Sequence, residues 1–143
     1  MKGGIMTTHP YLRAYMAGVT VPSVFLLFVF VVFCVIRLAY TPDFPIERVL
    51  VFPLALVPAI WGVWNMVYLA MHTRRYMPLG CHGALVPVFL IPVALAAAKA
   101  FGFELTLAAS WTVIIVALPL LTILYYLAWK FRVGFLNETL GIA

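Results

Sequence analysis

The sequence predicts an all-α membrane protein: a bundle of four transmembrane helices with both the N- and the C-terminus in the cytoplasm. Three observations predict it, namely four long uncharged stretches, a very low charged fraction and an uneven distribution of the charges. Only 9% of the 143 residues are charged, whereas a soluble domain has about 25%. A water-exposed surface cannot be built from this composition. We therefore expect residues 1–143 to form a single integral membrane domain.

The uncharged stretches are long enough to cross a bilayer. Lys, Arg, Asp and Glu are absent from residues 14–36, 49–73, 76–98 and 105–129. The hydrocarbon core of a bilayer is about 30 Å thick and needs roughly 20 helical residues at about 1.5 Å each. The predicted transmembrane helices are about 17–39, 49–71, 84–102 and 106–129.

The segments between these helices carry helix-breaking residues. An interfacial start at Pro10 leads into the first helix, and two prolines in the outer loop 40–48 prevent its continuation. Pro78, Gly80 and Gly83 mark turns between the second and third helices. A short turn at 102–104 precedes the fourth helix, and the tail 130–143 is too short to fold alone.

The charges predict the orientation. If the connections alternate between the two sides, one side carries six basic residues and Glu138, and the other carries three basic and three acidic residues. An excess of Lys and Arg marks the cytoplasmic face, so we expect both termini and the 74–82 loop to lie there, in the plasma membrane. The net charge of +5 would then attract anionic lipid headgroups, and we expect no nucleic acid partner.

The second helix carries the most suggestive constellation. Pro58, Trp61, Asn65, Tyr68 and His72 follow at spacings of 3, 4, 3 and 4, which places them on one stripe of an α-helix. A bare amide facing lipid is costly, so Asn65 should face another helix, a cavity or a partner. One interpretation is a pocket for a quinone or lipid, with Trp61 as a flat wall and Asn65 and Tyr68 as hydrogen-bonding groups. The simpler interpretation, which we favour, is that Asn65 fastens neighbouring helices.

Three prolines suggest a different function. Pro58, Pro92 and Pro119 lie about 13–20 Å along their predicted helices, near the middle of the membrane. Kinks at one depth could open a cavity, as in transporters with broken helices. However, no ionisable residue accompanies them near the midplane. Static kinks are the favoured interpretation.

The histidines and cysteines give weak signals for a metal. His72 and His82 flank the inner loop beside Cys81 and are candidate ligands for a metal or for haem iron. Their spacing matches no metal-binding signature, and headgroup-level histidines are the favoured interpretation. Cys34 and Cys81 should lie on opposite sides of the membrane, so we expect no disulfide between them.

Small residues supply possible packing faces. The pairs four residues apart are Ala14 and Gly18, Ala55 and Ala59, and Ala94 and Ala98. Such faces let helix backbones approach closely, either inside the bundle or against another subunit.

These features predict a protein without its own catalytic site. The sequence has no recognisable catalytic motif and only four acidic residues, and we predict no cofactor. We expect an accessory or scaffolding subunit of a larger membrane complex, or a homo-oligomer, that contacts other membrane subunits or copies of itself. A small transporter or channel is one alternative. A quinone- or haem-binding redox subunit is the other.

Overall fold

A computed structural model describes residues 9–39, 54–72, 77–100 and 111–142. Helices account for almost all of these residues, and no strand occurs among them. Within these ranges four helical spans are long and apolar enough to cross a membrane. This confirms the predicted all-α class with four potential spans.

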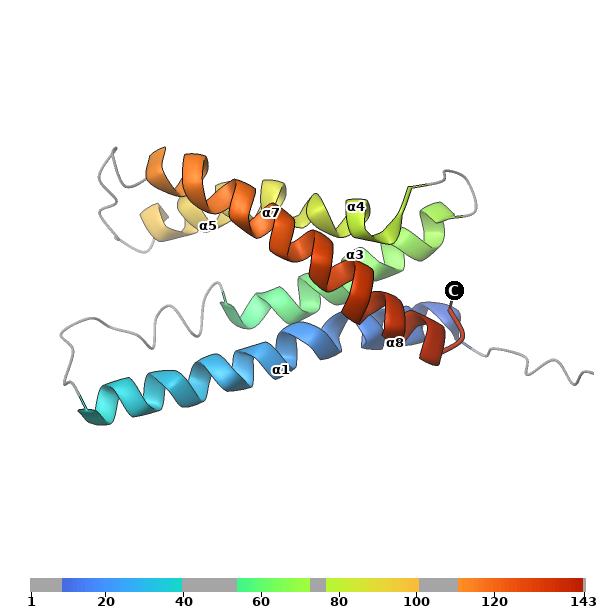
Figure 1. The fold of residues 1–143 in the computed structure, drawn as a ribbon, viewed down its shortest axis with the longest axis horizontal. Coiled ribbons are helices and arrows are strands. Elements are labelled where there is room, and N and C mark those ends of the chain that lie inside the picture. The colour runs from blue at the N-terminus through green and yellow to red at the C-terminus, as the bar shows by residue number, and fades with distance from the viewer. Residues whose placement is uncertain (1–8, 40–53, 73–76, 101–110, 143) are drawn as a thin grey trace, which may run out of the picture.

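Figure 1 shows that each span after the first consists of shorter elements. The first span is α1 (Pro10–Ala39). The second is a 3-10 turn, η1 (Leu54–Leu56), followed by α3 (Val57–His72). The third is α4 (Leu79–Ala84) followed by α5 (Val86–Ala100). In the fourth, the π-helical segments η2 (Val113–Ala117) and η3 (Ala128–Val133) alternate with α7 (Leu118–Leu127) and α8 (Gly134–Thr139).

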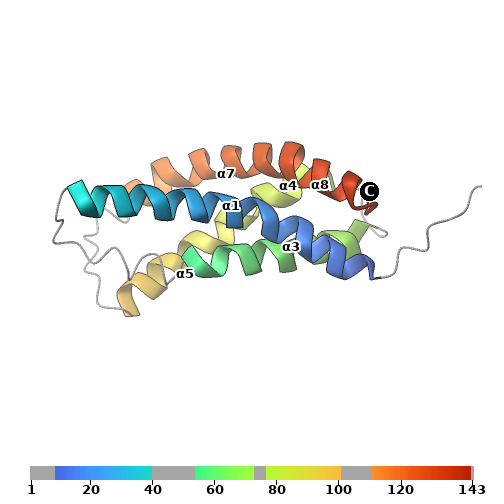
Figure 2. The same ribbon diagram turned by 90° about the horizontal axis from the view of Figure 1, so that it is seen from below.

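The helices run up and down along a common long axis, as Figure 2 shows from a second direction. Both described ends of the chain lie at the same end of the bundle, where the Arg13 guanidinium donates a hydrogen bond of 3.2 Å to the Leu140 carbonyl oxygen. We call this the terminal end. The predicted loop 40–48 and turn 102–104 lie outside the described residues.

Helix α1 begins at Pro10, several residues before the predicted start at about 17. The backbone N–H of Arg13 donates to the His9 carbonyl oxygen at 3.2 Å, which closes the first turn. Pro10 suits this position because the first residues of a helix need no intrahelical N–H.

The prediction that Gly80 and Gly83 mark turns was wrong, because both lie inside α4 and the third span starts at Leu79 instead of about 84. The glycines are needed for close packing. A Cβ at Gly80 would lie 2.8 Å from Cε2 of Tyr126, and one at Gly83 would overlap the side chain of Trp129. The break comes later, at Leu85, because Pro87 has no N–H to donate to the preceding turn.

The fourth span continues to Thr139, ten residues past its predicted end at 129, so most of the tail 130–143 belongs to this helix. Trp129, Val133 and Asn137 recur every four residues, and all three are buried. This face packs against the rest of the bundle and carries the helix past the charged residues. Gly141 then ends it, with φ +66°. The N–H groups of Gly141 and Ile142 donate to the carbonyls of Glu138 and Asn137, as in a Schellman motif.

A close backbone crossing joins α1 to α3. A Cβ at Gly18 would lie 2.5 Å from the Trp61 carbonyl oxygen, and one at Gly62 would lie 2.6 Å from the Tyr15 ring. Ala14, on the same face of α1 as Gly18, is fully buried. The first predicted small-residue face is therefore a packing face inside the chain.

The other small-residue faces differ. Ala55 and Ala59 are exposed, and Ala94 is half-buried. The side chain of Ala98 lies outside the described residues. The Ala55/Ala59 face is therefore not used for close packing within the described part of the bundle.

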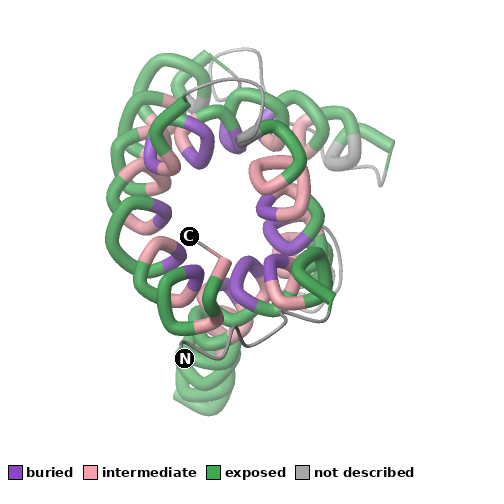
Figure 3. Tube along the Cα trace, turned by 90° about the vertical axis from the view of Figure 1, so that its right-hand side faces the viewer, coloured by how far each residue is buried: buried purple, intermediate pink, exposed green. Residues whose placement is uncertain are grey.

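The packing is tight toward the terminal end and sparse at the opposite end of α1. All buried residues of α1 lie between Ala14 and Pro22, and none of residues 23–39 is buried. Phe25, Phe28 and Leu38 are among the large apolar side chains exposed there. Figure 3, viewed along the long axis, shows the buried parts of the helices turned toward one another and the exposed parts turned outward.

The prolines do not form the predicted row of kinks inside helices. Pro58 is the second residue of α3, directly after the turn η1. Pro119 lies in the first turn of α7, directly after η2. Pro92 lies inside α5, and Pro22 lies inside α1. Two of the three predicted kinks are therefore junctions between helical segments.

The glycine crossing can be tested by adding one methyl group. We expect Gly18→Ala to lower the free energy of unfolding by about 1–3 kcal/mol, because its Cβ would meet a backbone oxygen that cannot rotate away. Thermal unfolding in detergent micelles measures the change. Gly134→Ala is the matched control: its Cβ would lie 3.6 Å from Leu79 Cδ2, an ordinary contact. Equal stability of the two variants would contradict the crossing.

Candidate functional site

The described side chains of the predicted stripe on α3 face the interior of the bundle, but they do not share one pocket. Trp61 and Asn65 are buried, whereas Pro58 and Tyr68 are half-buried. The side chain of His72 lies outside the described residues. The surroundings of each described side chain show what it can do.

Asn65 is the centre of a polar clamp that joins α1, α3 and α8. Its Nδ2 donates to the Ala14 carbonyl oxygen at 2.8 Å and to Oδ1 of Asn137 at 2.8 Å. Nδ2 of Asn137 donates back to Oδ1 of Asn65 at 3.3 Å. Both side chains are almost fully buried, with 0% and 2% exposed. Both amide hydrogens and the oxygen of Asn65 are thus satisfied within the chain.

Asn137 was missed by the sequence reasoning. The predicted fourth helix ends at about 129, which leaves Asn137 in the tail and Asn65 without an amide partner. The four-residue recurrence of Trp129, Val133 and Asn137 was the available signal, since it is the periodicity of a helix face.

His82 is enclosed by the bundle, which the sequence analysis does not predict. Its side chain is only 3% exposed, and its ring stacks on Trp64 with centroids 4.8 Å apart. The rings of Tyr68 and Trp129 lie 5.3 Å and 5.9 Å from it. Three aromatic residues from two helices therefore enclose the imidazole.

Two hydrogen bonds fix His82 to α3. The Nε2 atom lies 3.0 Å from the Trp64 carbonyl oxygen, and an acceptor of this kind requires the proton on Nε2. In return, the Trp64 indole N–H donates to the His82 carbonyl oxygen at 2.9 Å. This carbonyl lies next to the break between α4 and α5. The hydrogen-bonded Nε2 is not a free metal ligand.

Of the candidate metal pair His72 and His82, the structure describes the side chain of His82 alone. No group of three or more His, Cys, Asp or Glu side chains that could hold a metal ion occurs among the described residues. Cys34 and Cys81 are free thiols, both exposed.

Trp61 packs inside the bundle and does not line the cavity described below. Its ring lies 5.3 Å from that of Trp129 and 4.9 Å from that of Tyr125, in an edge-to-face arrangement. With Val86 and Val133 these rings form the apolar core. Within the described residues, the indole N–H groups of Trp61 and Trp129 have no hydrogen-bond acceptor.

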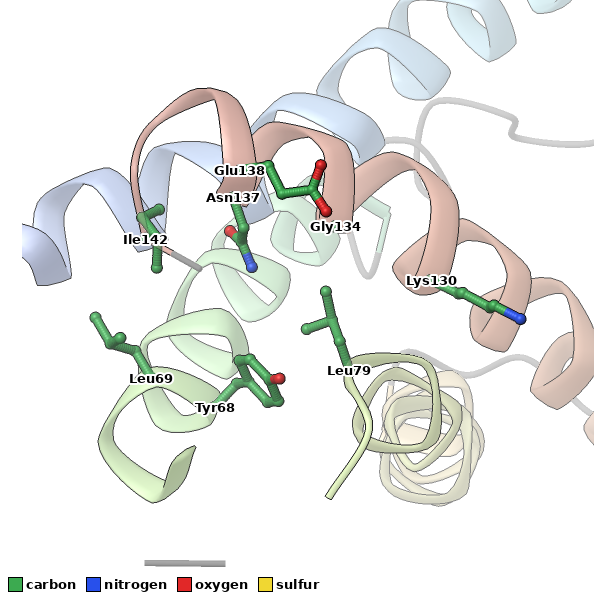
Figure 4. A pocket seen from close by; sticks show the side chains of 8 residues that line it. All are labelled: Tyr68, Leu69, Leu79, Lys130, Gly134, Asn137, Glu138 and Ile142. Atoms are coloured by element: carbon green, nitrogen blue, oxygen red, sulfur yellow. The ribbon is translucent and has the colours of Figure 1, made fainter. Parts of the chain in front are cut away.

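A cavity of about 230 Å³ lies at the terminal end, between α3, α4 and the η3–α8 segment. Leu69, Leu79 and Ile142 form its apolar wall. Tyr68 and Asn137 contribute polar groups, and Lys130 and Glu138 contribute opposite charges (Figure 4). Of the residues on the predicted stripe, Tyr68 reaches this cavity, while Asn65 lies behind Asn137 in the clamp.

Comparison with known proteins adds no further assignment. No protein family model matches the chain, and no significant similarity connects it to a curated protein or to a solved structure.

The clamp predicts a particular pattern of stability losses. Asn65→Leu and Asn137→Leu should each lower the free energy of unfolding by about 1–2 kcal/mol, because each leaves the other amide buried without its partner. The double variant should lose clearly less stability than the two single variants added together, since it leaves neither amide unpaired. Unfolding in detergent micelles measures the cycle.

Thr122→Val is the matched control. The Thr122 hydroxyl donates at 2.7 Å to Leu118 within its own helix, so its loss should not couple to either asparagine. Strictly additive losses for the two asparagine variants would contradict the clamp.

Proposed function

We propose that this protein is a small integral membrane protein of the plasma membrane that has no catalytic site of its own. It serves as an accessory or scaffolding subunit of a larger membrane complex or of a homo-oligomer. Four apolar spans support the membrane placement.

One observation carries this proposal: the buried amides and the buried imidazole of the described interior bond to the chain itself. Asn65 and Asn137 bond to each other and to Ala14. The imidazole of His82 is used in contacts with Trp64. A substrate or a redox cofactor needs polar groups that are directed at it, whereas these hydrogen bonds hold helices together.

The two alternatives receive less support. A transporter was expected to have a cavity at the level of Pro58, Pro92 and Asn65, but the cavity described above lies at the terminal end and is lined by none of them. A quinone pocket was expected to use Trp61 as a wall, and Trp61 is covered by Tyr125 and Trp129.

The outer half of α1 is the place to test for a partner. Residues 23–39 include no buried residue, and Phe28 is 65% exposed. A photoreactive phenylalanine analogue at Phe28 should cross-link in native membranes to another membrane polypeptide or to a second copy, as seen by mass spectrometry. The same analogue at Ile123 of α7, which is 58% exposed, is the control. Adducts with lipid alone at both sites, with purification as a lone monomer, would count against a subunit role.

The orientation is part of the proposal, with the terminal end in the cytoplasm because it carries the excess of basic residues. Cys81 is exposed at this end, in the first turn of α4. In a Cys34→Ser background, a membrane-impermeant maleimide should label Cys81 only after the cells are permeabilised. Thr139→Cys, at the end of α8, should behave in the same way. Labelling of either site in intact cells would reverse the orientation.

A further inference from the structure

The cavity at the terminal end has a chemistry that the scaffolding role does not use. We propose that it binds a phosphate ester that carries a primary ammonium group, presented as the headgroup of a membrane phospholipid such as phosphatidylethanolamine. The proposal rests on the membrane placement proposed above but not on the identity of any protein partner.

The position of the cavity suits a headgroup. It lies where the second and fourth spans end, and its rim carries the exposed charged side chains of Lys130 and Glu138. Its wall of Leu69, Leu79 and Ile142 is apolar. A polar mouth with an apolar wall matches the boundary between headgroups and acyl chains.

The two charges at the rim favour a zwitterion. Lys130 and Glu138 are eight residues apart, or about 12 Å along a helix axis, and form no ion pair with each other in the described structure. An anion would be attracted by Lys130 and repelled by Glu138. A simple cation would be repelled by Lys130 and attracted by Glu138. A phosphate next to an ammonium group can meet both charges at once.

Lys130 can reach a phosphate at the mouth. Its ammonium lies 5.8 Å and 5.3 Å from the ring centroids of Tyr126 and Phe131, and Figure 4 shows it directed away from Asn137. A lysine has a flexible four-carbon stem with rotatable donors. A change of rotamer at this exposed residue turns the ammonium toward the cavity.

The floor of the cavity offers a buried donor. Asn137 is 2% exposed and lines the cavity. Its Nδ2 donates one hydrogen bond, to Asn65, although an amide nitrogen carries two hydrogens. The second hydrogen can be donated to a phosphate or ester oxygen. Figure 4 shows the Asn137 amide and the Tyr68 ring on facing elements, α8 and α3, across this space.

The size of the cavity favours a headgroup over a whole small molecule. Its volume of about 230 Å³ is below the roughly 300–1,000 Å³ of pockets that enclose drug-sized ligands. A quinone ring would also leave Lys130 and Glu138 without a charged counterpart. A lipid needs only its headgroup inside, since its chains stay in the bilayer.

The test measures lipid retention by the purified full-length protein in detergent, using native mass spectrometry. Phosphatidylethanolamine, phosphatidylcholine and phosphatidylglycerol of identical chain length are offered in turn. We expect the ethanolamine lipid to be retained roughly tenfold better than the other two, as one charge-assisted hydrogen bond from its ammonium would produce. Equal retention of all three lipids, or better retention of phosphatidylglycerol, would overturn the proposal.

Three variants assign the binding to the cavity. Glu138→Gln should abolish the preference for ethanolamine over glycerol headgroups, and Lys130→Gln should weaken retention of all three lipids. Gly134→Leu should block the cavity, because a Cβ at Gly134 has an ordinary 3.6 Å contact with the cavity residue Leu79 and a longer side chain extends into the space. Lys99→Gln, near the far end of α5, is the control and should bind like the unchanged protein.

Two further outcomes are decisive. Circular dichroism and thermal unfolding establish that each variant is folded, and a folded Gly134→Leu variant that retains the ethanolamine lipid would exclude this cavity as the site. Displacement of the lipid by an equal concentration of soluble phosphoethanolamine would exclude a membrane lipid as the ligand. A third outcome separates the two proposals. If the unchanged protein shows no lipid selectivity but cross-links through Phe28 to a membrane polypeptide or to a second copy, this inference alone is overturned and the proposed subunit role stands.

Discussion

The structure depends on one buried interaction, the pairing of Asn65 with Asn137 and with the Ala14 carbonyl. In the proposed membrane location there is little hydrophobic driving force between apolar helices, so their association relies on close packing and on hydrogen bonds. Burying an amide between these helices without a hydrogen-bond partner would cost far more free energy than leaving it exposed to water. The clamp therefore sets which helices must be neighbours: α1, α3 and α8 can satisfy their polar groups only when they meet at this level of the bundle.

The glycines make that meeting possible. Gly18 brings the α1 backbone against the carbonyl of Trp61, one turn from Asn65, which is close enough for the amide to reach Ala14. Gly83 allows a similarly close approach between α4 and η3, because the ring of Trp129 occupies the space that a Cβ would need. The aromatic rings then fill the space between these crossings. None of the residues of α1 after Pro22 is buried.

The sequence predicted the number of spans, their approximate positions and the inward-facing stripe, because charge-free length and helical periodicity depend on the chain alone. It also favoured the interhelical role for Asn65. It did not predict the role of Asn137, because the charge of Lys130 marks the end of the apolar stretch, although an exposed lysine can extend away from the bundle while its helix continues. It misassigned Gly80 and Gly83, because a glycine that opens a turn and a glycine that admits an aromatic ring look the same in sequence. It also did not predict that His82 is enclosed, since the enclosing rings come from α3 and η3.

The extension of the fourth helix past Lys130 connects the clamp to the cavity. If the helix stopped at residue 129, Asn65 would lose its partner, and the cavity would lose the wall that carries Asn137 and Glu138. One amide serves both: the Oδ1 and one hydrogen of Asn137 bond to Asn65, and the second hydrogen is available at the cavity. A ligand that accepted this hydrogen would hold the amide plane in the orientation that Asn65 requires. Occupancy of the cavity and closure of the bundle at its terminal end would then stabilise each other, because a ligand that binds the closed arrangement shifts the equilibrium toward it.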